Sequence, residues 1–384
     1  MRPLKILHTA DWHLGLVSWR SHREVNRFEE QKECLEKLLE VAEKERVDLI
    51  LHAGDLFHQH YHPPKEAIQL AAEAIVALSR VAPFIWVLGN HDWYAVEALQ
   101  KMFPSGVTVI RDMAPRDFPD LEVTIFPIPY LPLSRFLAEH PGETIQERAK
   151  AYLKDTMRKW VDSFNPHHFH ILLGHLTVEE LAFYAEANAS REIFLKKADF
   201  PHGFSYGALG HLHGYTCLHD PFVLCYPSSL VPDNFRNPGE KGAFLLVELV
   251  PGERPRIHPV FLETSSLVSI DLEEPLGVLE VRRLVEERLQ NGRRNYVRLR
   301  VRNRTLSPEW TAELKNLRGE RFEVVVIETL WDEEEKQEEV ATSSFDVTAL
   351  PELFARFARE RGFPEEVVQY FEMYYRQVLE GEKL

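Results

Sequence analysis

The sequence is poor in cysteine and contains no long apolar run. Its 384 residues include three cysteines, Cys34, Cys217 and Cys225, whose spacing matches neither a zinc site nor a redox motif. Because an odd number of cysteines argues against a disulfide framework, we interpret all three as small apolar side chains. No run reaches the about 18 consecutive apolar residues of a membrane span, and residues 1–5 lead directly into an apolar run. We therefore expect a cytoplasmic protein that neither crosses a membrane nor carries a secretion signal.

Positive charge is also scarce. The 45 Lys and Arg residues face 60 Asp and Glu residues, which gives a formal net charge of −15. This balance excludes a generally basic surface, so any contact with DNA must rest on a local basic patch, a metal centre or a partner. The hydrophobic content of 45% is ordinary for a globular protein, and the length predicts two or three domains.

What the sequence does contain is a series of five short apolar runs, each of which ends at a polar cluster. The clusters read Asp-x-His (residues 11–13), Gly-Asp (54–55), Gly-Asn-His-Asp (89–92), Gly-His (174–175) and Gly-His-x-His (210–213). Short apolar runs are typical of buried strands, and functional groups in open α/β sheets gather at the carboxyl ends of the strands. Asp, Asn and His without thiolates suit Mn²⁺, Fe²⁺ or Zn²⁺. The sequence therefore predicts a metal site built from strand ends.

Together the five motifs resemble the signature of the calcineurin-like metallophosphoesterases. Within that superfamily, residues 7–15, 54–58 and 89–92 resemble the nucleases of the SbcD and meiotic-recombination-eleven type. The chain departs from them at residues 226–229, where Ser228 stands at a position that the family usually gives to Gly. The resemblance implies an α/β fold: a two-layer β-sandwich flanked by helices, a small α/β capping domain and a C-terminal helix pair.

The resemblance also implies a centre with two Mn²⁺ ions per chain. The expected ligands are Asp11, His13 and His213 for the first ion, Asn90, His175 and His211 for the second, and Asp55 as the bridge between them. His91 would stabilise the transition state or protonate the leaving oxygen, and His58 would position the phosphate. We interpret the neighbouring His60 and His62 as loop histidines without a role as ligands.

Strands and helices alternate between the motifs. Apolar residues at helical spacing predict helices over residues 23–46, 65–80 and 145–164, and further strands follow at 222–226, 243–249 and 257–261. We assign residues 1–265 to the metallophosphoesterase nuclease domain. The pattern starts again after residue 265, and residues 266–331 predict a capping domain of the order βαβαβ.

The capping domain contains the one basic stretch of the sequence, residues 293–304. Arg298, Arg300 and Arg302 alternate with apolar residues and therefore project from one face of a strand. This face either is simply solvated or contacts DNA phosphates, and the sequence leaves both interpretations open.

The C-terminal part combines an acidic linker, residues 332–344, with a predicted helix-loop-helix at 345–384. Its apolar side chains include Leu353, Phe354, Phe357, Val367, Phe371, Tyr374 and Tyr375. Chains below about 40 residues rarely fold without a metal, a disulfide or a partner. The helix pair therefore packs either on its own nuclease domain or on another protein. The resemblance implies the second, with an SbcC-type SMC-like ATPase as partner of a homodimer, which together form a heterotetramer.

The function implied by the resemblance is that of a Mn²⁺-dependent DNA nuclease in double-strand break repair and recombination. It would act as a 3′–5′ exonuclease on duplex ends and as an endonuclease on single strands and hairpins, associated with the nucleoid when it acts on DNA. The alternatives are a phosphodiesterase or protein phosphatase with a substrate other than DNA, which would not need the added domains, and a metal-dead scaffold, against which the intact ligand set argues.

Overall fold

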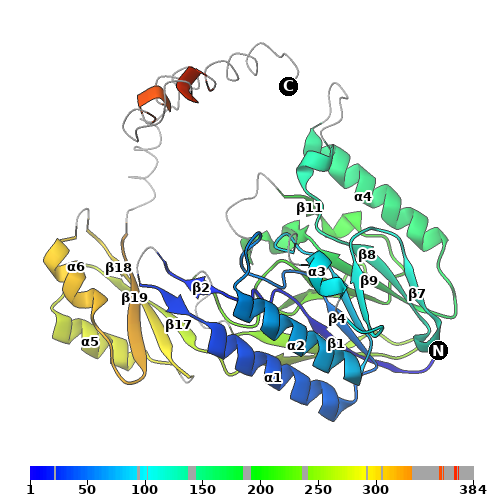
Figure 1. Ribbon diagram of the computed structural model, residues 1–384, viewed down its shortest axis with the longest axis horizontal. Coiled ribbons are helices and arrows are strands. Elements are labelled where there is room, and N and C mark those ends of the chain that lie inside the picture. Colours follow the sequence, from blue (N-terminus) through cyan, green and yellow to red (C-terminus); the bar gives the residue numbers. More distant parts are fainter. Residues whose placement is uncertain are drawn as a thin grey trace. The chain divides into compact units, whose positions relative to one another are not determined.

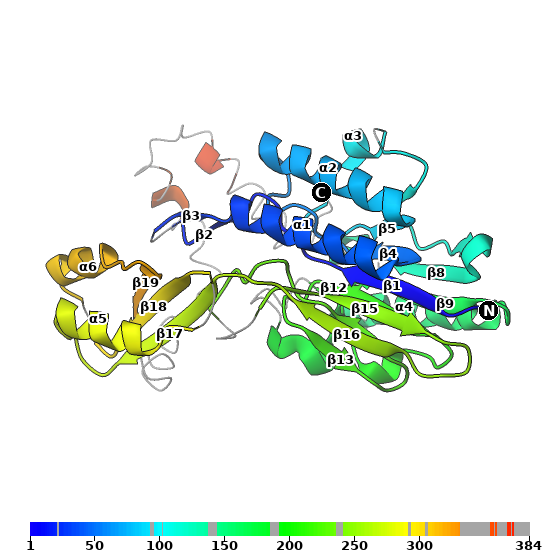
Figure 2. The same cartoon turned by 90° about the horizontal axis from the view of Figure 1, so that it is seen from below.

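The computed structural model describes residues 1–330 except 21–22, 93–95, 102, 137–143, 185–191, 236–240, 291–292 and 304–305, together with 354–356, 358, 367–369 and 371. The chain divides into two compact units, of which the first comprises Met1–Val301 and Thr305–Glu328 and the second Arg302–Arg304 and Thr329–Leu384. The first unit contains two six-stranded sheets and a separate three-stranded sheet (Figures 1 and 2).

The first six-stranded sheet has the order β16-β15-β1-β4-β5-β6. Four of its strands are parallel: β1 (Leu4–Thr9), β4 (Leu49–His52), β5 (Phe84–Val87) and β6 (Val107–Ile110). Strands β15 (Ala243–Leu249) and β16 (Arg256–Phe261) extend it in antiparallel fashion beside β1. Because β1, β4 and β5 are parallel, the three motifs that follow them lie at the same edge of the sheet.

The second sheet has the order β13-β14-β12-β9-β8-β7. Its strands are β7 (Arg116–Phe118), β8 (Val123–Ile128), β9 (Phe169–His175), β12 (Tyr206–Gly210), β13 (Thr216–Leu218) and β14 (Leu224–Tyr226). Apolar residues such as Ile6 and Leu51 of the first sheet pack against Ile125, Ile171 and Ala208 of the second. This shared core confirms the predicted two-layer β-sandwich.

Helices cover the outer faces of the sandwich. On the first sheet lie α1 (Phe28–Glu45) and α2 (Lys65–Val81), which are side by side in Figure 1, and α3 (Val96–Gln100) follows β5. On the second sheet lies α4 (Ile145–Asp162), whose N-terminus is fixed by a capping box of Thr144 and Glu147. Helix α1 begins later than predicted because residues 25–26 form β3 (Val25–Asn26), paired with β2 (Val17–Ser18). In the described part of the chain no helix is long and apolar enough to cross a membrane.

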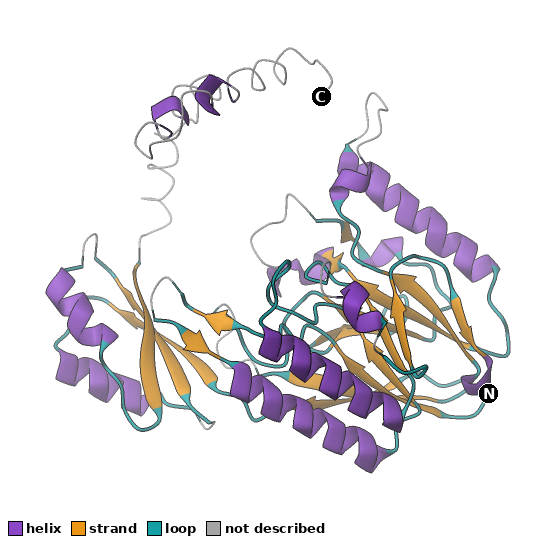
Figure 3. Ribbon diagram, in the orientation of Figure 1, coloured by secondary structure: helices purple, strands orange, loops and turns teal. Residues whose placement is uncertain are grey.

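Residues 266–329 form the predicted βαβαβ unit. Its sheet consists of β17 (Ser266–Leu272), β18 (Asn295–Val301) and β19 (Phe322–Thr329), and α5 (Val278–Glu287) and α6 (Pro308–Lys315) cover one face (Figure 3). On the other face Leu267, Tyr296 and Val325 belong to a cluster with Phe235 and Trp19. The capping unit therefore has a core of its own and an apolar contact with loops of the sandwich.

The described residues of the C-terminal helix pair contact one another. Phe354 and Phe371 stack with ring centroids 4.0 Å apart and an interplanar angle of 18°. Ala358 and Val368 are buried beside them. Part of the apolar surface that the sequence assigned to a partner thus holds the two helices together. The acidic linker at 332–344 lies outside the described residues.

The interpretation of the cysteines is wrong for two of the three. Cys217 on β13 and Cys225 on β14 form a disulfide, whereas Cys34 is free and buried on α1. The two strands are antiparallel and place Cys217 directly opposite Cys225. The odd number of cysteines therefore left one residue over and did not exclude a bridge.

Candidate metal centre

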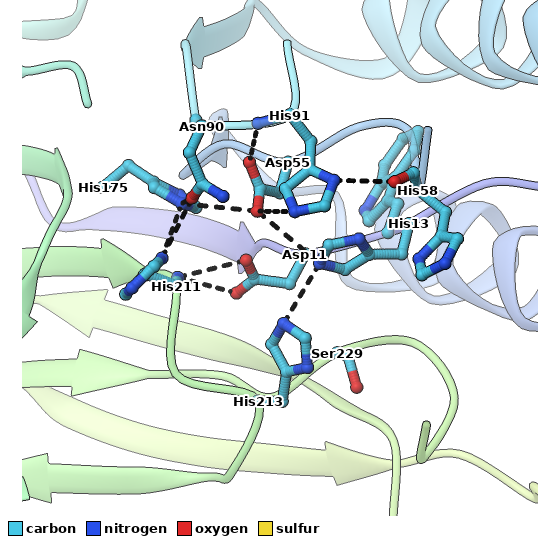
Figure 4. Close-up of polar contacts among 12 residues, drawn as sticks. Asp11, His13, Asp55, His58, Asn90, His91, His175, His211, His213 and Ser229 are labelled. Carbon is cyan, nitrogen blue, oxygen red and sulfur yellow. Dashed lines mark hydrogen bonds and ion pairs between the residues drawn. The ribbon is translucent and has the colours of Figure 1, made fainter. Parts of the chain in front are cut away.

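The carboxyl ends of five strands bring the predicted ligands together (Figure 4). Asp11 and His13 follow β1, Asp55 follows β4, Asn90 and His91 follow β5, His175 ends β9, and His211 and His213 follow β12. Their ligand atoms form three compact groups: Asp11 with His13 and His213, His13 with Asp55 and His91, and Asp55 with His175 and His211. Residues such as His13 and His213, 200 positions apart in the chain, thus share one site where both sheets end.

The backbone leaves these strands in conformations that most residues avoid. Asp11, His13, Asp55 and His211 have φ angles of 50°, 44°, 58° and 101°. Such conformations typically cost about 1–3 kcal/mol each and persist where the surroundings fix them. Hydrogen bonds between the loops do this here, because the backbone N–H of Asp11 donates to the Gly54 carbonyl at 2.9 Å and that of His211 donates to the Asp11 carboxylate. The ligands are therefore held in place by the protein itself.

Gly54, directly before Asp55, has φ of 96°. A Cβ at this position would collide with Nδ1 of His175. The glycine in the Gly-Asp motif is thus required both by the backbone conformation and by the close approach of a ligand.

Asp55 is the central residue of the site. Its Oδ2 lies 3.6 Å from His13 Nε2, 3.5 Å from His175 Nε2 and 3.9 Å from His91 Nε2. Burial raises the pKa of this carboxyl, but the surrounding histidines, His175 above all, lower it more, so that it lies well below its usual value. An ionised oxygen therefore sits between the two ligand groups, as a bridging ligand requires.

On one side of Asp55, the rings of His13 and His213 point at each other with their Nε2 atoms 3.0 Å apart. The Nδ1 of His213 donates to Oδ2 of Asp233 at 3.0 Å, which leaves its Nε2 with a lone pair. Burial lowers the pKa of His13 well below its usual value and raises that of Asp11 to about 6. This group offers two ring nitrogens and one carboxylate to a common point.

On the other side, three atoms form a triangle. Asn90 Oδ1 lies 2.8 Å from His175 Nε2 and 3.1 Å from His211 Nδ1, and these two nitrogens are 3.2 Å apart. His175 uses its Nδ1 to donate to the Ala53 carbonyl at 2.8 Å, and His211 uses its Nε2 to donate to Glu192 at 2.9 Å. All three inward atoms therefore carry lone pairs when the rings are neutral.

Lone pairs that face one another in a buried site are unfavourable unless a proton or a cation lies between them. Without a cation a proton takes this role on His175: burial lowers its pKa, but the contact with Asp55 raises it more, to about 9. A metal ion would replace such a proton, because binding of a metal requires deprotonated ligands. The oxygen and nitrogen donors, together with the absence of sulfur among them, thus fit divalent cations such as Mn²⁺.

His91 lies beside the ligands, with its ring fixed from two sides. Its Nδ1 donates to the His58 carbonyl at 2.7 Å, so that Nε2 faces Asp55. His60, which the sequence gave no role, stacks on His91 with centroids 3.8 Å apart and approaches the Asn90 carbonyl at 3.1 Å. Burial and then the charge of His91 lower the pKa of His58 to about 4. The predicted catalytic residue therefore presents its Nε2 to the site.

Asp92 completes the Gly-Asn-His-Asp motif but had no predicted role. It is 1% exposed and accepts from the backbone N–H groups of Asp55 (2.9 Å), Leu56 (2.8 Å) and Gly89 (2.9 Å) and from the Trp86 indole (3.2 Å). The loop after β4 is thereby tied to the loop after β5. Asp92 is a structural clamp of the site.

Glu192 and Asp233 are two further acidic residues that sequence reasoning missed. Glu192 precedes β11 (Phe194–Leu195), which pairs with β10 (Thr177–Val178), and Asp233 lies in the loop after β14. Because each carboxylate takes the outer nitrogen of one histidine, His211 turns Nδ1 inward while His213 turns Nε2 inward. Neither residue belongs to a motif, so nothing in the sequence marked them.

The departure at Ser228 has a structural explanation. Ser228 has φ of 107°, in the region that favours glycine, and it is buried. Its hydroxyl donates to the His213 carbonyl at 2.6 Å. The loop thus keeps a glycine-type backbone conformation with a serine whose hydroxyl is hydrogen-bonded to the backbone of the predicted ligand His213.

The predicted DNA-contacting arginines have partners within the protein. Arg298 donates to Ser269 Oγ (3.1 Å) and the Phe235 carbonyl (3.0 Å) and pairs with Glu328 (3.3 Å), while Arg300 forms two hydrogen bonds with Asp271, at 2.7 and 2.8 Å. Arg302 is not part of the strand. Contact of these arginines with phosphates stays a prediction.

Of the predicted partner-binding residues, Phe354, Val367 and Phe371 are described, and Val367 is 36% exposed. Leu353, Phe357, Tyr374 and Tyr375 lie outside the described residues. Docking of a partner on this helix pair also stays a prediction.

A helix-flanked double sheet whose strand ends gather oxygen and nitrogen ligand atoms around one aspartate defines a metal-dependent phosphoesterase. The family model of the calcineurin-like phosphoesterases matches residues 4–215, more than half of the chain. The protein therefore belongs to this family, as the sequence motifs predicted.

Similar proteins include two that are named as the SbcD component of the nuclease SbcCD. The one from Staphylococcus epidermidis is 27% identical over 312 residues, which cover 78% of this chain and 79% of that protein. The one from Staphylococcus saprophyticus is 28% identical over 289 residues, which cover 71% of this chain and 72% of that protein. Among solved structures, a dimetal phosphatase from Danio rerio is 11% identical, with a TM-score of 0.42 over 67% of this chain and 95% of that chain, which is too low to carry an argument.

Proposed function

We propose that this protein is a DNA nuclease that hydrolyses phosphodiester bonds with two Mn²⁺ ions per chain. The observation that carries the proposal is the pair of ligand groups on either side of Asp55, each made of atoms that face one another with lone pairs. The similarity to two proteins named as nucleases supports a nucleic acid as the substrate, and the resemblance of the motifs supports DNA.

Asp11, His13 and His213 would hold one ion, Asn90, His175 and His211 the other, and Asp55 would touch both. Bound divalent ions polarise a phosphate and acidify a water molecule for in-line attack. His91 contributes through its Nε2, from which it stabilises charge on the phosphate or passes a proton to the leaving oxygen. His58 positions the phosphate with a ring that is neutral near pH 7, because burial lowers its pKa to about 4.

The proposed reactions are 3′–5′ exonuclease action on duplex ends and endonuclease action on single strands and hairpins, in double-strand break repair and recombination. A net charge of −15 leaves the metal centre and local basic residues to attract DNA. This part of the proposal rests on the resemblance of the motifs and on the names of the relatives.

We test it with duplex DNA and the purified chain. Wild-type protein with Mn²⁺ should release nucleotides from a duplex labelled at one 3′ end, whereas Asp55→Asn should release none under the same conditions. Metal binding without hydrolysis of any DNA substrate, combined with hydrolysis of a phosphoprotein or a small diester, would assign the centre to another phosphoesterase function.

For the partner, we propose an SbcC-type SMC-like ATPase that docks on the C-terminal helix pair of a homodimer to give a heterotetramer. The relatives are named as one component of a complex, and Val367 of the helix pair is exposed. Truncation after Glu339 should abolish capture of the ATPase and leave metal-dependent hydrolysis and the melting temperature of the core unchanged. Retained capture, or a large loss of melting temperature, would place the helix pair in the protein's own core.

A further inference from the structure

One short loop connects the capping domain with the metal centre. Residues 232–235, which we call the connector segment, follow β14 and contain Asp233. At one end, the Pro232 carbonyl accepts from Nη1 of Arg27 at 2.9 Å. At the other end, the Phe235 carbonyl accepts from Nη2 of Arg298, on β18 of the capping domain, at 3.0 Å. Two arginines therefore grip the backbone on either side of Asp233.

Both arginines are themselves fixed. Arg27 is 1% exposed and pairs with Glu30 at 2.8 Å. Arg298 bonds to Ser269 and Glu328, and its guanidinium lies over the Phe235 ring at 5.1 Å from the centroid. The grip on the connector segment is thus held from the nuclease domain at one end and from the capping domain at the other.

Asp233 links the connector segment to the metal centre. Its Oδ1 accepts from the Asn234 side chain at 2.8 Å, and its Oδ2 accepts from Nδ1 of His213 at 3.0 Å. A carboxylate on the outer nitrogen of a ligating histidine fixes its tautomer and orientation and raises its basicity. Displacement of Asp233 would therefore weaken His213 as a ligand.

We propose that Arg298 is a positioning residue for the metal centre: it holds Asp233 against His213 and so sets the affinity of the ion bound by Asp11, His13 and His213. This inference rests on the two-ion centre of the proposed function. It gives Arg298 a role within the protein in place of a direct contact with DNA, and it couples the capping domain to one of the two ions.

The chain offers a matched control for the change of Arg298 and another for the change of Asp233. Arg300 lies two residues further along β18 and pairs with Asp271 at 2.7 Å. Glu192 makes the corresponding contact with His211, which belongs to the other ion, at 2.9 Å. If losing any arginine charge weakens metal binding, Arg300→Gln should weaken it as much as Arg298→Gln does. If losing any nearby carboxylate weakens metal binding, Asp233→Asn and Glu192→Gln should each weaken the binding of both ions.

The experiment is a Mn²⁺ titration by calorimetry, with electron paramagnetic resonance to distinguish a coupled pair of ions from a single ion. Asp233→Asn should weaken the binding of the ion held by Asp11, His13 and His213 by about 10- to 100-fold. Arg298→Gln should weaken the binding of the same ion by a smaller factor, and Glu192→Gln should weaken the binding of the other ion. Arg300→Gln should leave the affinity for both ions unchanged. The double variant Arg298→Gln/Asp233→Asn should bind no more weakly than Asp233→Asn alone, because both changes act through one contact.

Wild-type affinity for both ions in Arg298→Gln, equal weakening of both ions, or a loss that adds to that of Asp233→Asn would overturn the inference. If Arg298→Gln lowers the melting temperature strongly, Glu328→Gln is the milder variant, since it removes only the acidic partner of Arg298. Unchanged affinity for the first ion in that variant would equally overturn it. Binding of fewer than two ions by the wild-type protein would instead contradict the proposed function.

Discussion

The strand ends of the sandwich and the arginine face of β18 both have the sequence pattern of a binding site, but they differ in how their polar groups are paired. At the strand ends, Asn90, His175 and His211 point their acceptor atoms at one another, within 3.2 Å. On β18, Arg298 and Arg300 each have an acidic partner inside the capping domain. Acceptor atoms that the fold gathers around one point, where only a proton or a cation can satisfy them, indicate a ligand, whereas the arginines of β18 already have partners within the structure.

The largest effect should follow from a change at the strand ends of the sandwich. Asp55→Asn should abolish Mn²⁺ binding and hydrolysis together, because Asp55 lies between both ligand groups. His91→Asn should keep both ions and lose roughly 10²- to 10⁴-fold in rate, the usual contribution of a positioned acid or base. Calorimetry and hydrolysis of duplex DNA measure the two effects. If His91→Asn loses an ion, His91 is a ligand and its assigned role is wrong.

A change at Asp92 should act on stability, because this carboxylate is fully paired. Asp92→Ala leaves several buried donors without an acceptor, and each such donor costs about 1–3 kcal/mol, so we expect a loss of at least about 2 kcal/mol in the free energy of unfolding. Denaturant unfolding measures it. Asp112→Ala is the control, since Asp112 pairs with Arg116 on the surface, where ion pairs contribute little. Equal stability of both variants would contradict the role of Asp92 as a clamp.

The arginine face gives a smaller effect, measured on DNA. The logarithm of the binding constant for duplex DNA falls linearly with the logarithm of the salt concentration. If Arg298, Arg300 and Arg302 all contact phosphates, replacing the three with Gln should reduce the slope of this line by about 3, one for each contact. Since Arg298 and Arg300 have acidic partners inside the protein, we expect a change in this slope well below about 3. Binding measured over a range of salt concentrations decides, and a change near the larger value would restore the interpretation based on the sequence.

The smallest effect concerns Ser228. Ser228→Gly removes a strained φ of 107° and also the hydrogen bond to the His213 carbonyl, so the free energy of unfolding should change by less than about 1 kcal/mol. Ser228→Ala loses the hydrogen bond and keeps the strain, and it should be the less stable of the two variants. Thermal melts compare them. Equal melting temperatures would show that the backbone at this position is not strained.

The sequence predicted what depends on local pattern. Strand, glycine and predicted ligand are neighbours in four of the five motifs, so Asp55 or His175 can be placed at a strand end from a few residues. The helices α1, α2 and α4 and the βαβαβ order of the capping unit followed in the same way from apolar spacing. Local signals, together with the resemblance of the motifs, were enough to predict the sandwich and to name seven residues that the structure brings together; that these residues bind metal stays a prediction.

Features that depend on tertiary contacts or on the register of neighbouring strands could not be predicted. Glu192 and Asp233 meet His211 and His213 only because loops from separate parts of the fold return to the strand ends. The pairing of Cys217 with Cys225 depends on the register of β13 against β14, which no composition argument gives. The partners of Arg298 likewise come from β17, β19 and the loop after β14.

The most direct test of the account is the number of Mn²⁺ ions that the wild-type chain binds and whether they interact. Calorimetry should give two ions per chain and electron paramagnetic resonance should show a coupled pair, whereas Asp55→Asn should lose the bound ions and with them the coupled signal. A single ion per chain, or two ions without coupling that remain bound in Asp55→Asn, would contradict a centre in which Asp55 bridges two metals.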